Sequence, residues 1–193
     1  MAQEIDIVIP TVLPQRSAEL SALLSQLGGW SVRVEVHMPG APPWARVERI
    51  FGQPRGELVV QLEDDITLAP GAINRIIAVA RECWGQWALF SFFSRERHLA
   101  PGIAKCHPGR FHMTQAIALR APAARDFAAW FPAWKASHPT LKSGIGQGLG
   151  AWARETGADI LVHYPSLVQH LPVASTISRR PLNRQSPTFG GAP

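Results

Sequence analysis

The sequence predicts an α/β fold with a parallel sheet. Short runs of β-branched and apolar residues alternate along the chain with segments whose apolar residues recur at helical spacing. The first strand, helix and second strand follow one another within about thirty residues, the length of a βαβ unit. The 193 residues suit a single domain, at roughly one domain per 150 residues.

The first unit occupies the N-terminal part of the chain. Residues 5–9 (Ile-Asp-Ile-Val-Ile) form a β-branched run that Pro10 closes, which predicts a buried strand. Leucines then recur at helical spacing until two glycines end the pattern, so a helix is expected over 17–27. Valines alternate with charged residues over 32–36, which predicts the second strand.

The remaining elements follow from the same patterns. In chain order they are a short helix at 44–51, a strand at 58–62, a helix opened by Pro70 and Gly71, strands at 87–93 and 115–119, helices at 122–130 and 147–156, and a last strand at 159–163. Residues 94–114 are predicted to be a polar, His-rich loop. No periodicity is seen after Pro165.

Composition excludes several classes of protein. A hydrophobic fraction of 46% excludes wholesale disorder, and two cysteines exclude a disulfide framework or a four-cysteine zinc site. No apolar run approaches the roughly 18 residues that a membrane span needs. The N-terminus lacks the basic start and apolar stretch of a secretory signal, so a cytoplasmic protein is expected.

The balance of charge is basic, with 19 Lys and Arg against 14 Asp and Glu. Arginine dominates, and its guanidinium pairs well with phosphate. The excess fits a nucleotide diphosphate pocket, a nucleic-acid surface, or the general amino-acid usage of a GC-rich genome.

Three consecutive acids, Glu63, Asp64 and Asp65, end the predicted strand at 58–62. Side chains alternate on an extended segment, so Glu63 and Asp65 should point to one side and Asp64 to the other. In open α/β sheets, ligands bind just beyond the carboxyl ends of strands. Hard oxygen ligands suit Mg²⁺ or Mn²⁺, and a solvated acidic turn would give the same triplet.

One histidine follows the last predicted strand, in the run Pro165-Ser166-Leu167-Val168-Gln169-His170. Imidazole is an acceptable ligand for Mn²⁺ and a poorer one for Mg²⁺. A lone histidine is more often a structural or surface residue, so His170 is a candidate ligand only in combination with the acids.

These segments, taken in order, resemble the small GT-A glycosyltransferases, which transfer a sugar from a nucleotide-diphosphate sugar. Residues 7–11 (Ile-Val-Ile-Pro-Thr) with Arg16 resemble the opening strand and nucleotide-binding loop of that family, and 62–66 (Leu-Glu-Asp-Asp-Ile) its acidic DxD-type motif. Residues 164–170 with Ser175 resemble the segment that returns to the metal, and 184–189 a closing motif of some members.

The resemblance implies a role for each matching residue. Asp65 would bind Mn²⁺ or Mg²⁺ directly, with His170 as a second ligand or a phosphate contact. Asp64 would face the ribose or reach the metal through water, and Glu63 would support both acids. The nucleotide pocket would be lined by Pro10, Thr11 and Arg16.

The resemblance also implies an organisation for the whole chain. Residues 1–193 would form one GT-A-like catalytic domain, with a Rossmann-like, mixed, mostly parallel sheet flanked by helices. The nucleotide-sugar-binding half would lie at 1–93 and the acceptor-side half at 94–175. Residues 176–193 would be a basic tail. Arg180 and Arg184 in this tail could fold over the diphosphate, although a disordered basic tail fits the composition nearly as well.

The carboxylate that inverting members use as a general base has no match here. The expected acid falls at or near Gly146 or Gln147, so the base is missing, comes from elsewhere, or is not needed by a retaining enzyme. Gln147 is instead a candidate to hold the sugar, and His112 is a candidate base from a loop on the acceptor side. His138 and Glu155 are weaker candidates.

Two other functions remain open from the sequence. A sugar nucleotidyltransferase shares the fold, but its first loop carries glycines that residues 11–16 lack. A non-enzymatic nucleic-acid binder would use the arginine excess, but no motif of such proteins is present. Nucleic acid or a glycan could also be the acceptor of a transferase.

Overall fold

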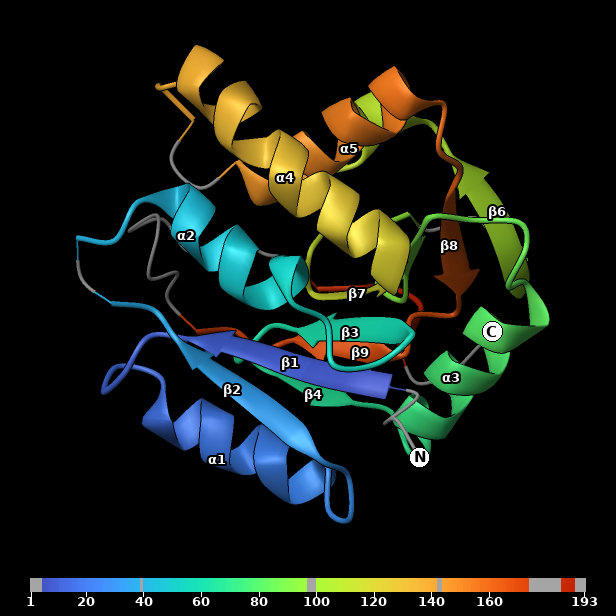
Figure 1. The fold of residues 1–193 in the computed structure, drawn as a ribbon. Coiled ribbons are helices and arrows are strands. Elements are labelled where there is room, and N and C mark those ends of the chain that lie inside the picture. Colours follow the sequence, from blue (N-terminus) through green and yellow to red (C-terminus); the bar gives the residue numbers. More distant parts are fainter. Residues whose placement is uncertain (1–4, 39, 97–99, 142–143, 174–184, 190–193) are drawn as a thin grey trace.

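The computed structural model describes residues 5–38, 40–96, 100–141, 144–173 and 185–189. Its main element is a seven-stranded sheet with the strand order β2-β1-β3-β7-β5-β8-β6 (Figure 1). Helices cover both faces of this sheet. The predicted single α/β domain is therefore confirmed.

The N-terminal half of the sheet is parallel. β1 (Ile5–Thr11) lies between β2 (Val32–Val36) and β3 (Leu58–Leu62) and runs parallel to both. The connection from β1 to β2 is α1 (Ser17–Gln26). The predicted βαβ unit is thus present, and the carboxyl ends of these three strands lie at one edge of the sheet.

The C-terminal half makes the sheet mixed. β7 (Ala116–Arg120) is antiparallel to β3 and to β5 (Leu89–Ser91), whereas β8 (Ile160–Tyr164) is parallel to β5. β6 (Gly102–Cys106) forms the edge, antiparallel to β8. Two strands, β6 and β7, therefore oppose the common direction of the other five, as a mostly parallel sheet requires.

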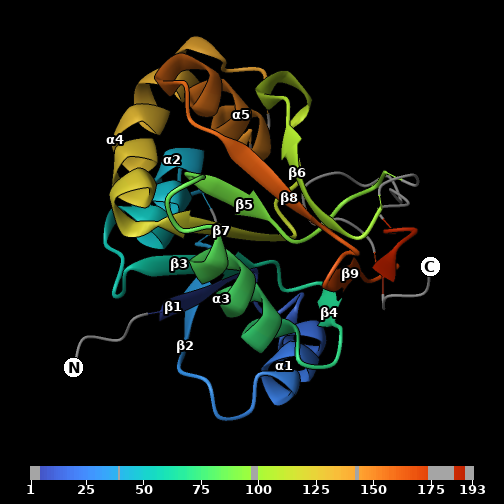
Figure 2. The ribbon, with the colours of Figure 1, turned by 90° about the vertical axis from the view of Figure 1, so that its right-hand side faces the viewer.

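Two hydrophobic cores form, one on each face of the sheet. One face is covered by α1 and α3 (Ala72–Glu82), and the other by α2 (Pro43–Val47), a short π-helical turn (Glu48–Gly52), α4 (Ala121–Ser137) and α5 (Ile145–Thr156) (Figures 1 and 2). Alternate residues of β3 enter different cores: Val60 belongs to the first and Val59 to the second. A strand buried on both faces reads as a continuous apolar run, which explains why β3 was predicted correctly.

A second, two-stranded sheet lies beyond the carboxyl end of β3. β4 (Ile66–Leu68) pairs antiparallel with β9 (Val168–His170). This small sheet brings the segment after β8 back to the segment after β3.

Two expectations about loops were wrong. Residues 94–114 contain β6 and a 3₁₀ turn at Pro108–Arg110, and the chain after Pro165 contains β9. β6 is an edge strand whose side chains are mostly exposed or half-buried, so it lacks a buried strand's apolar alternation. β9 has only three residues, which is too short to show a period.

The boundaries of several other elements also differ from the sequence prediction. β1 continues through Pro10 to Thr11, and the largest differences are in α4 and β5. α4 continues beyond residue 130 to Ser137, although Pro132 lies inside it. Phe127 and Phe131, which are buried on one face of this helix, hold the extended segment against the second core. Proline removes one backbone hydrogen bond, and this packing compensates for the loss. β5 is only Leu89–Ser91, shorter than the predicted 87–93.

Candidate metal and nucleotide site

Three potential ligands meet beyond the carboxyl end of β3. One ligand atom each from Glu63, Asp65 and His170 lie within 4.8 Å of one another. Asp65 and His170 are buried, and Glu63 is half-buried. Glu63 and Asp65 thus converge on one ligand position, as their alternation predicted.

The small sheet brings His170 to the acids. Its register places Ile66 opposite His170, and the backbone N–H of Leu171 donates to the carbonyl of Asp65 at 2.8 Å. As a result, Nε2 of His170 lies 3.4 Å from Oδ2 of Asp65.

Arg16 supplies a positive charge to the same carboxylate. Its Nη2 donates to Oδ2 of Asp65 at 3.2 Å, and its Nη1 donates to Glu19 at 3.3 Å. Arg16 is buried directly before α1, which begins at Ser17. The guanidinium therefore partly neutralises the acids in a position where it is shielded from water.

Glu63 is held from the opposite side by the segment before β7. The hydroxyl of Thr114 and Nε2 of Gln115, the latter at 3.3 Å, donate to its two carboxylate oxygens. The backbone N–H of Glu63 also donates to the carbonyl of Gln115 at 2.9 Å. These bonds fix the orientation of the carboxylate.

Asp64 points to a different environment, where Thr11 is its neighbour. Burial is the largest influence and raises the pKa of Asp64, and the nearby charge of Asp65 acts in the same direction. The Thr11 hydroxyl and the charges of Arg16 and Arg46 oppose this rise. Burial therefore disfavours the charged form of Asp64, and a further hydrogen-bond donor or a cation would stabilise that form.

Arg46, on α2, is a site residue that the sequence analysis missed. Burial lowers the pKa of Arg46, while the charges of the three acids at 63–65 act in the opposite direction. Its Nε is buried and has no hydrogen-bond partner among the residues that the structure describes. An arginine excess was the only signal in the sequence, because the proximity of Arg46 depends on how α2 packs.

His37 is the second missed residue. It directly follows β2, and its backbone N–H donates to the carbonyl of Thr11 at 2.7 Å. Burial, and then the charges of Arg46 and Arg49, lower the pKa of His37. Its Nδ1 is buried with no partner in the described part of the chain. His37 and Arg46 thus offer buried polar atoms at the ends of the parallel strands.

The three clustered ligands suit a hard or borderline divalent cation. Two carboxylates and one imidazole match Mn²⁺ well and Mg²⁺ less well. The hydrogen bonds that Glu63 accepts fit this interpretation, because they orient its carboxylate. Arg16 acts against it, because its positive charge competes with a cation for Asp65.

No protein-family model matches the chain, and no curated protein matches it by sequence. Among solved structures, S. aureus TarS 1-349 is similar with a TM-score of 0.57 and 10% identity over 88% of this chain. A glycosyltransferase involved in glycosylation of the major capsid of PBCV-1 is similar with a TM-score of 0.56 and 12% identity over 90% of this chain.

The chain has the GT-A glycosyltransferase fold. It spans 61% of TarS 1-349 and 37% of a longer TarS chain, but 95% of the PBCV-1 enzyme. TarS 1-349 has also been crystallised in complex with UDP-GlcNAc, and that structure matches with a TM-score of 0.51 and 11% identity.

Within this GT-A fold, most of the expected nucleotide-side residues lie at the same end of the sheet. Pro10 and Thr11 are the last two residues of β1 and are buried. Thr11 adjoins Asp64, and Arg16 contacts Asp65. Arg180 and Arg184 lie outside the described residues.

The two expected acceptor-side residues are not joined to the acids. Gln147 is exposed on α5, and His112 is exposed with its Nδ1 2.8 Å from the carbonyl of Arg110. Neither forms a hydrogen bond or ion pair with residues 63–65 in the described structure. A Cβ at Gly146 would lie 2.5 Å from the carbonyl oxygen of His112, so the backbone of His112 packs against the first turn of α5, which also contains Gln147. The glycines of α5 thus permit close packing.

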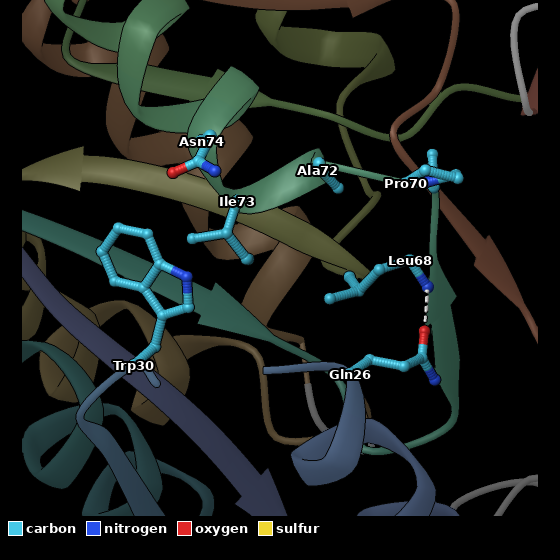
Figure 3. Close-up of a pocket in the computed structure, with 9 residues that line it drawn as sticks. Gln26, Trp30, Leu68, Pro70, Ala72, Ile73 and Asn74 are labelled. Atoms are coloured by element: carbon cyan, nitrogen blue, oxygen red, sulfur yellow. Dashed lines mark hydrogen bonds between the residues drawn. The ribbon is translucent and has the colours of Figure 1, made fainter. Parts of the chain in front are cut away.

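A separate pocket of the GT-A fold lies between α1 and α3 (Figure 3). Its volume is about 310 Å³, and its lining includes Gln26, Trp30 and residues 68–74. None of these lining residues is acidic or a histidine, so the pocket is distinct from the metal-ligand cluster. No helix of the described residues is long and apolar enough to cross a membrane.

Proposed function

We propose that this protein is a metal-dependent glycosyltransferase that moves a sugar from a nucleoside-diphosphate sugar to an acceptor hydroxyl. The observation that carries this proposal is the convergence of Glu63, Asp65 and His170 beyond the carboxyl end of β3. In open α/β sheets this edge is where ligands bind. The GT-A fold supports the proposal because it is shared with two glycosyltransferases.

In this proposal Asp65 and His170 hold the cation, with Glu63 as a third ligand or as support for them. The cation, Mn²⁺ or Mg²⁺, would neutralise charge on the leaving nucleoside diphosphate. Arg16 also contributes, since its buried guanidinium is the kind of group that pairs with phosphate oxygens.

The nucleoside would lie towards the ends of β1 and β2. Asp64, with Pro10 and Thr11, would contact the ribose, where a hydroxyl donor would relieve the cost of its buried charge. His37 and Arg46 have buried polar atoms that a bound nucleotide could satisfy. The first nucleotide to test is UDP, because TarS was crystallised with UDP and with UDP-GlcNAc.

The acceptor would bind on the side of residues 94–175. His112 and Gln147 are our candidates there, as general base and sugar contact respectively, because the backbone of His112 packs against the first turn of α5, which carries Gln147. Residues 1–93 would form the donor half. A glycan or a nucleic acid would each satisfy the requirement for an acceptor hydroxyl.

Binding calorimetry tests the donor half of this proposal. UDP, GDP, CDP and ADP are titrated with and without Mn²⁺ into the wild type, Asp65→Ala and Asp159→Ala. Asp159 is a matched control, since its exposed carboxylate pairs with Lys105 at the surface. We expect one nucleotide to bind in a Mn²⁺-dependent manner to the wild type and to Asp159→Ala, but not to Asp65→Ala.

Hydrolysis or transfer assays with the matching nucleotide sugar then test the reaction. Metal-dependent nucleotide binding that survives in Asp65→Ala would contradict the site. Release of pyrophosphate from a nucleoside triphosphate and a sugar phosphate would instead assign a nucleotidyltransferase.

A further inference from the structure

The small sheet that positions His170 is short. β4 and β9 contribute three residues each, and an isolated two-stranded sheet is marginally stable at best in water. The alignment of His170 with Asp65 therefore depends on what supports this sheet from outside.

One outer edge of the sheet is held by α1. The side-chain oxygen of Gln26 accepts from the backbone N–H of Leu68 at 2.9 Å, shown dashed in Figure 3, and from the hydroxyl of Thr67 at 3.1 Å. The Gln26 amide thus accepts a backbone hydrogen bond that a further strand beside β4 would otherwise accept.

The other strand is held by the C-terminal segment 185–189. The backbone N–H of Ser186 donates to Oε1 of Gln169 at 2.7 Å, and Nε2 of Gln169 donates to the carbonyl of Ser186 at 3.3 Å. Side chains alternate along β9, so Gln169 projects from the face opposite to Val168 and His170. The C-terminal segment thus binds the face of β9 that carries Gln169, and His170 lies on the opposite face.

Further bonds anchor this segment in the fold. The hydroxyl of Ser186 donates to that of Ser166 at 2.7 Å, and the backbone N–H of Ser166 donates to the hydroxyl of Thr188 at 3.2 Å. Ser166 also accepts from the backbone N–H of Ser94 at 2.9 Å. Ser94, Ser166 and Ser186 are all buried, so these bonds are shielded from water.

We propose that Gln169 and Ser186 are positioning residues of the metal site. Their paired hydrogen bonds make residues 185–189 a clasp that fixes β9, and the fixed strand directs His170 towards Asp65 and Glu63. The identity of the ion rests on the proposed function, whereas the clasp rests on the contacts alone. Because coupling between two sites is reciprocal, a bound cation should also stabilise the clasp.

A double-mutant cycle tests whether the clasp acts through His170. The affinity for Mn²⁺ is measured by calorimetry for the wild type, Gln169→Ala, His170→Ala and the double variant. We expect Gln169→Ala to weaken binding about three- to tenfold, the usual worth of one net hydrogen bond. In the His170→Ala background the same substitution should change the affinity by less than about twofold.

Two further variants complete this test. Ser186→Ala retains the backbone bonds to Gln169 but loses the hydroxyl bond to Ser166. It should lower the affinity for Mn²⁺ less than Gln169→Ala does. Gln86→Ala removes an exposed glutamine side chain in the turn after α3 and should bind Mn²⁺ like the wild type. Equal effects of Gln169→Ala with and without His170, or no effect in the wild type, would overturn the proposal.

Hydrogen exchange separates failure of the clasp from failure of the proposed function. A wild type that binds no Mn²⁺ contradicts the proposed metal site, and exchange of the Leu171 amide, which bonds to Asp65, then decides on the clasp. Faster exchange of this amide in Gln169→Ala than in Gln86→Ala supports the positioning role. Equal exchange overturns it.

Discussion

The Nε2 atom of His170 lies 3.4 Å from Oδ2 of Asp65, although the two residues belong to distant parts of the chain. The β4–β9 register brings them together, since it places Ile66 opposite His170. The same carboxylate oxygen lies 3.2 Å from Nη2 of Arg16. One oxygen of Asp65 therefore lies close to both the imidazole of His170 and the positively charged guanidinium of Arg16. Substitution of either neighbour should change how the site binds a cation.

Removal of the imidazole should weaken the metal site. We expect His170→Ala to lower the Mn²⁺ affinity at least about tenfold, because loss of even an outer partner of a metal ligand costs about 10–100-fold. Calorimetric titration with MnCl₂ measures this change. A Mn²⁺ affinity equal to that of the wild type would remove His170 from the ligand set.

Substitution of Arg16 should affect the ion and the nucleotide in opposite directions. Arg16→Gln removes a positive charge beside Asp65, so Mn²⁺ alone should bind more tightly than to the wild type. The nucleoside diphosphate should bind more weakly in the presence of Mn²⁺, because a phosphate partner is lost. Separate titrations of metal and of nucleotide measure the two effects. Losses of similar size in both would indicate that Arg16 acts only by holding the fold together.

The part of the site that the sequence could predict is the part determined locally. Glu63 and Asp65 follow a continuous apolar strand, and alternation alone places them on one side. The position of His170 depends on a three-residue strand that forms only by pairing with β4, and no local pattern reports such a pairing. The family resemblance, and not periodicity, predicts that the segment with His170 returns to the acids.

Arg46 and His37 show a different limit of the sequence. Arg46 lies inside a predicted helix and His37 directly follows a predicted strand. The proximity of Arg46 to the acids depends on the packing of α2, and the position of His37 depends on the register between β1 and β2. Long-range packing of this kind leaves no trace in the spacing of residues along the chain. The same holds for β6, which is recognisable as a strand only through its pairing with β8.

The glycines of α5 should be required for packing. A Cβ at Gly148 would lie 2.6 Å from Cε2 of Phe131, a fully buried ring. We expect Gly148→Ala to lower the free energy of unfolding by up to about 2 kcal/mol, because an overpacking cost of about 1–3 kcal/mol is offset by the roughly 1 kcal/mol that alanine gains in a helix. Urea unfolding measures the change. The matched variant is Gly85→Ala, where no atom lies within 4 Å, and equal stability of the two variants would refute this explanation.

His37 should make stability depend on pH in a definite direction. Burial and two arginines lower its pKa from the ordinary 6.5, so the folded protein keeps the imidazole neutral where the unfolded chain already binds a proton. The resulting stability is fully present above pH 6.5 and is lost as the pH falls through the folded pKa. His37→Asn, which cannot titrate, should lack this loss.

Urea unfolding of the wild type and His37→Asn between about pH 7.5 and pH 5.5 tests this expectation. The free energy of unfolding of the wild type, relative to that of the variant, should decrease as the pH falls. The decrease cannot exceed about 1.4 kcal/mol per pH unit, the limit for one proton. A difference that stays constant over this range would mean that His37 titrates alike in the folded and unfolded states, and that Arg46 and Arg49 do not influence it.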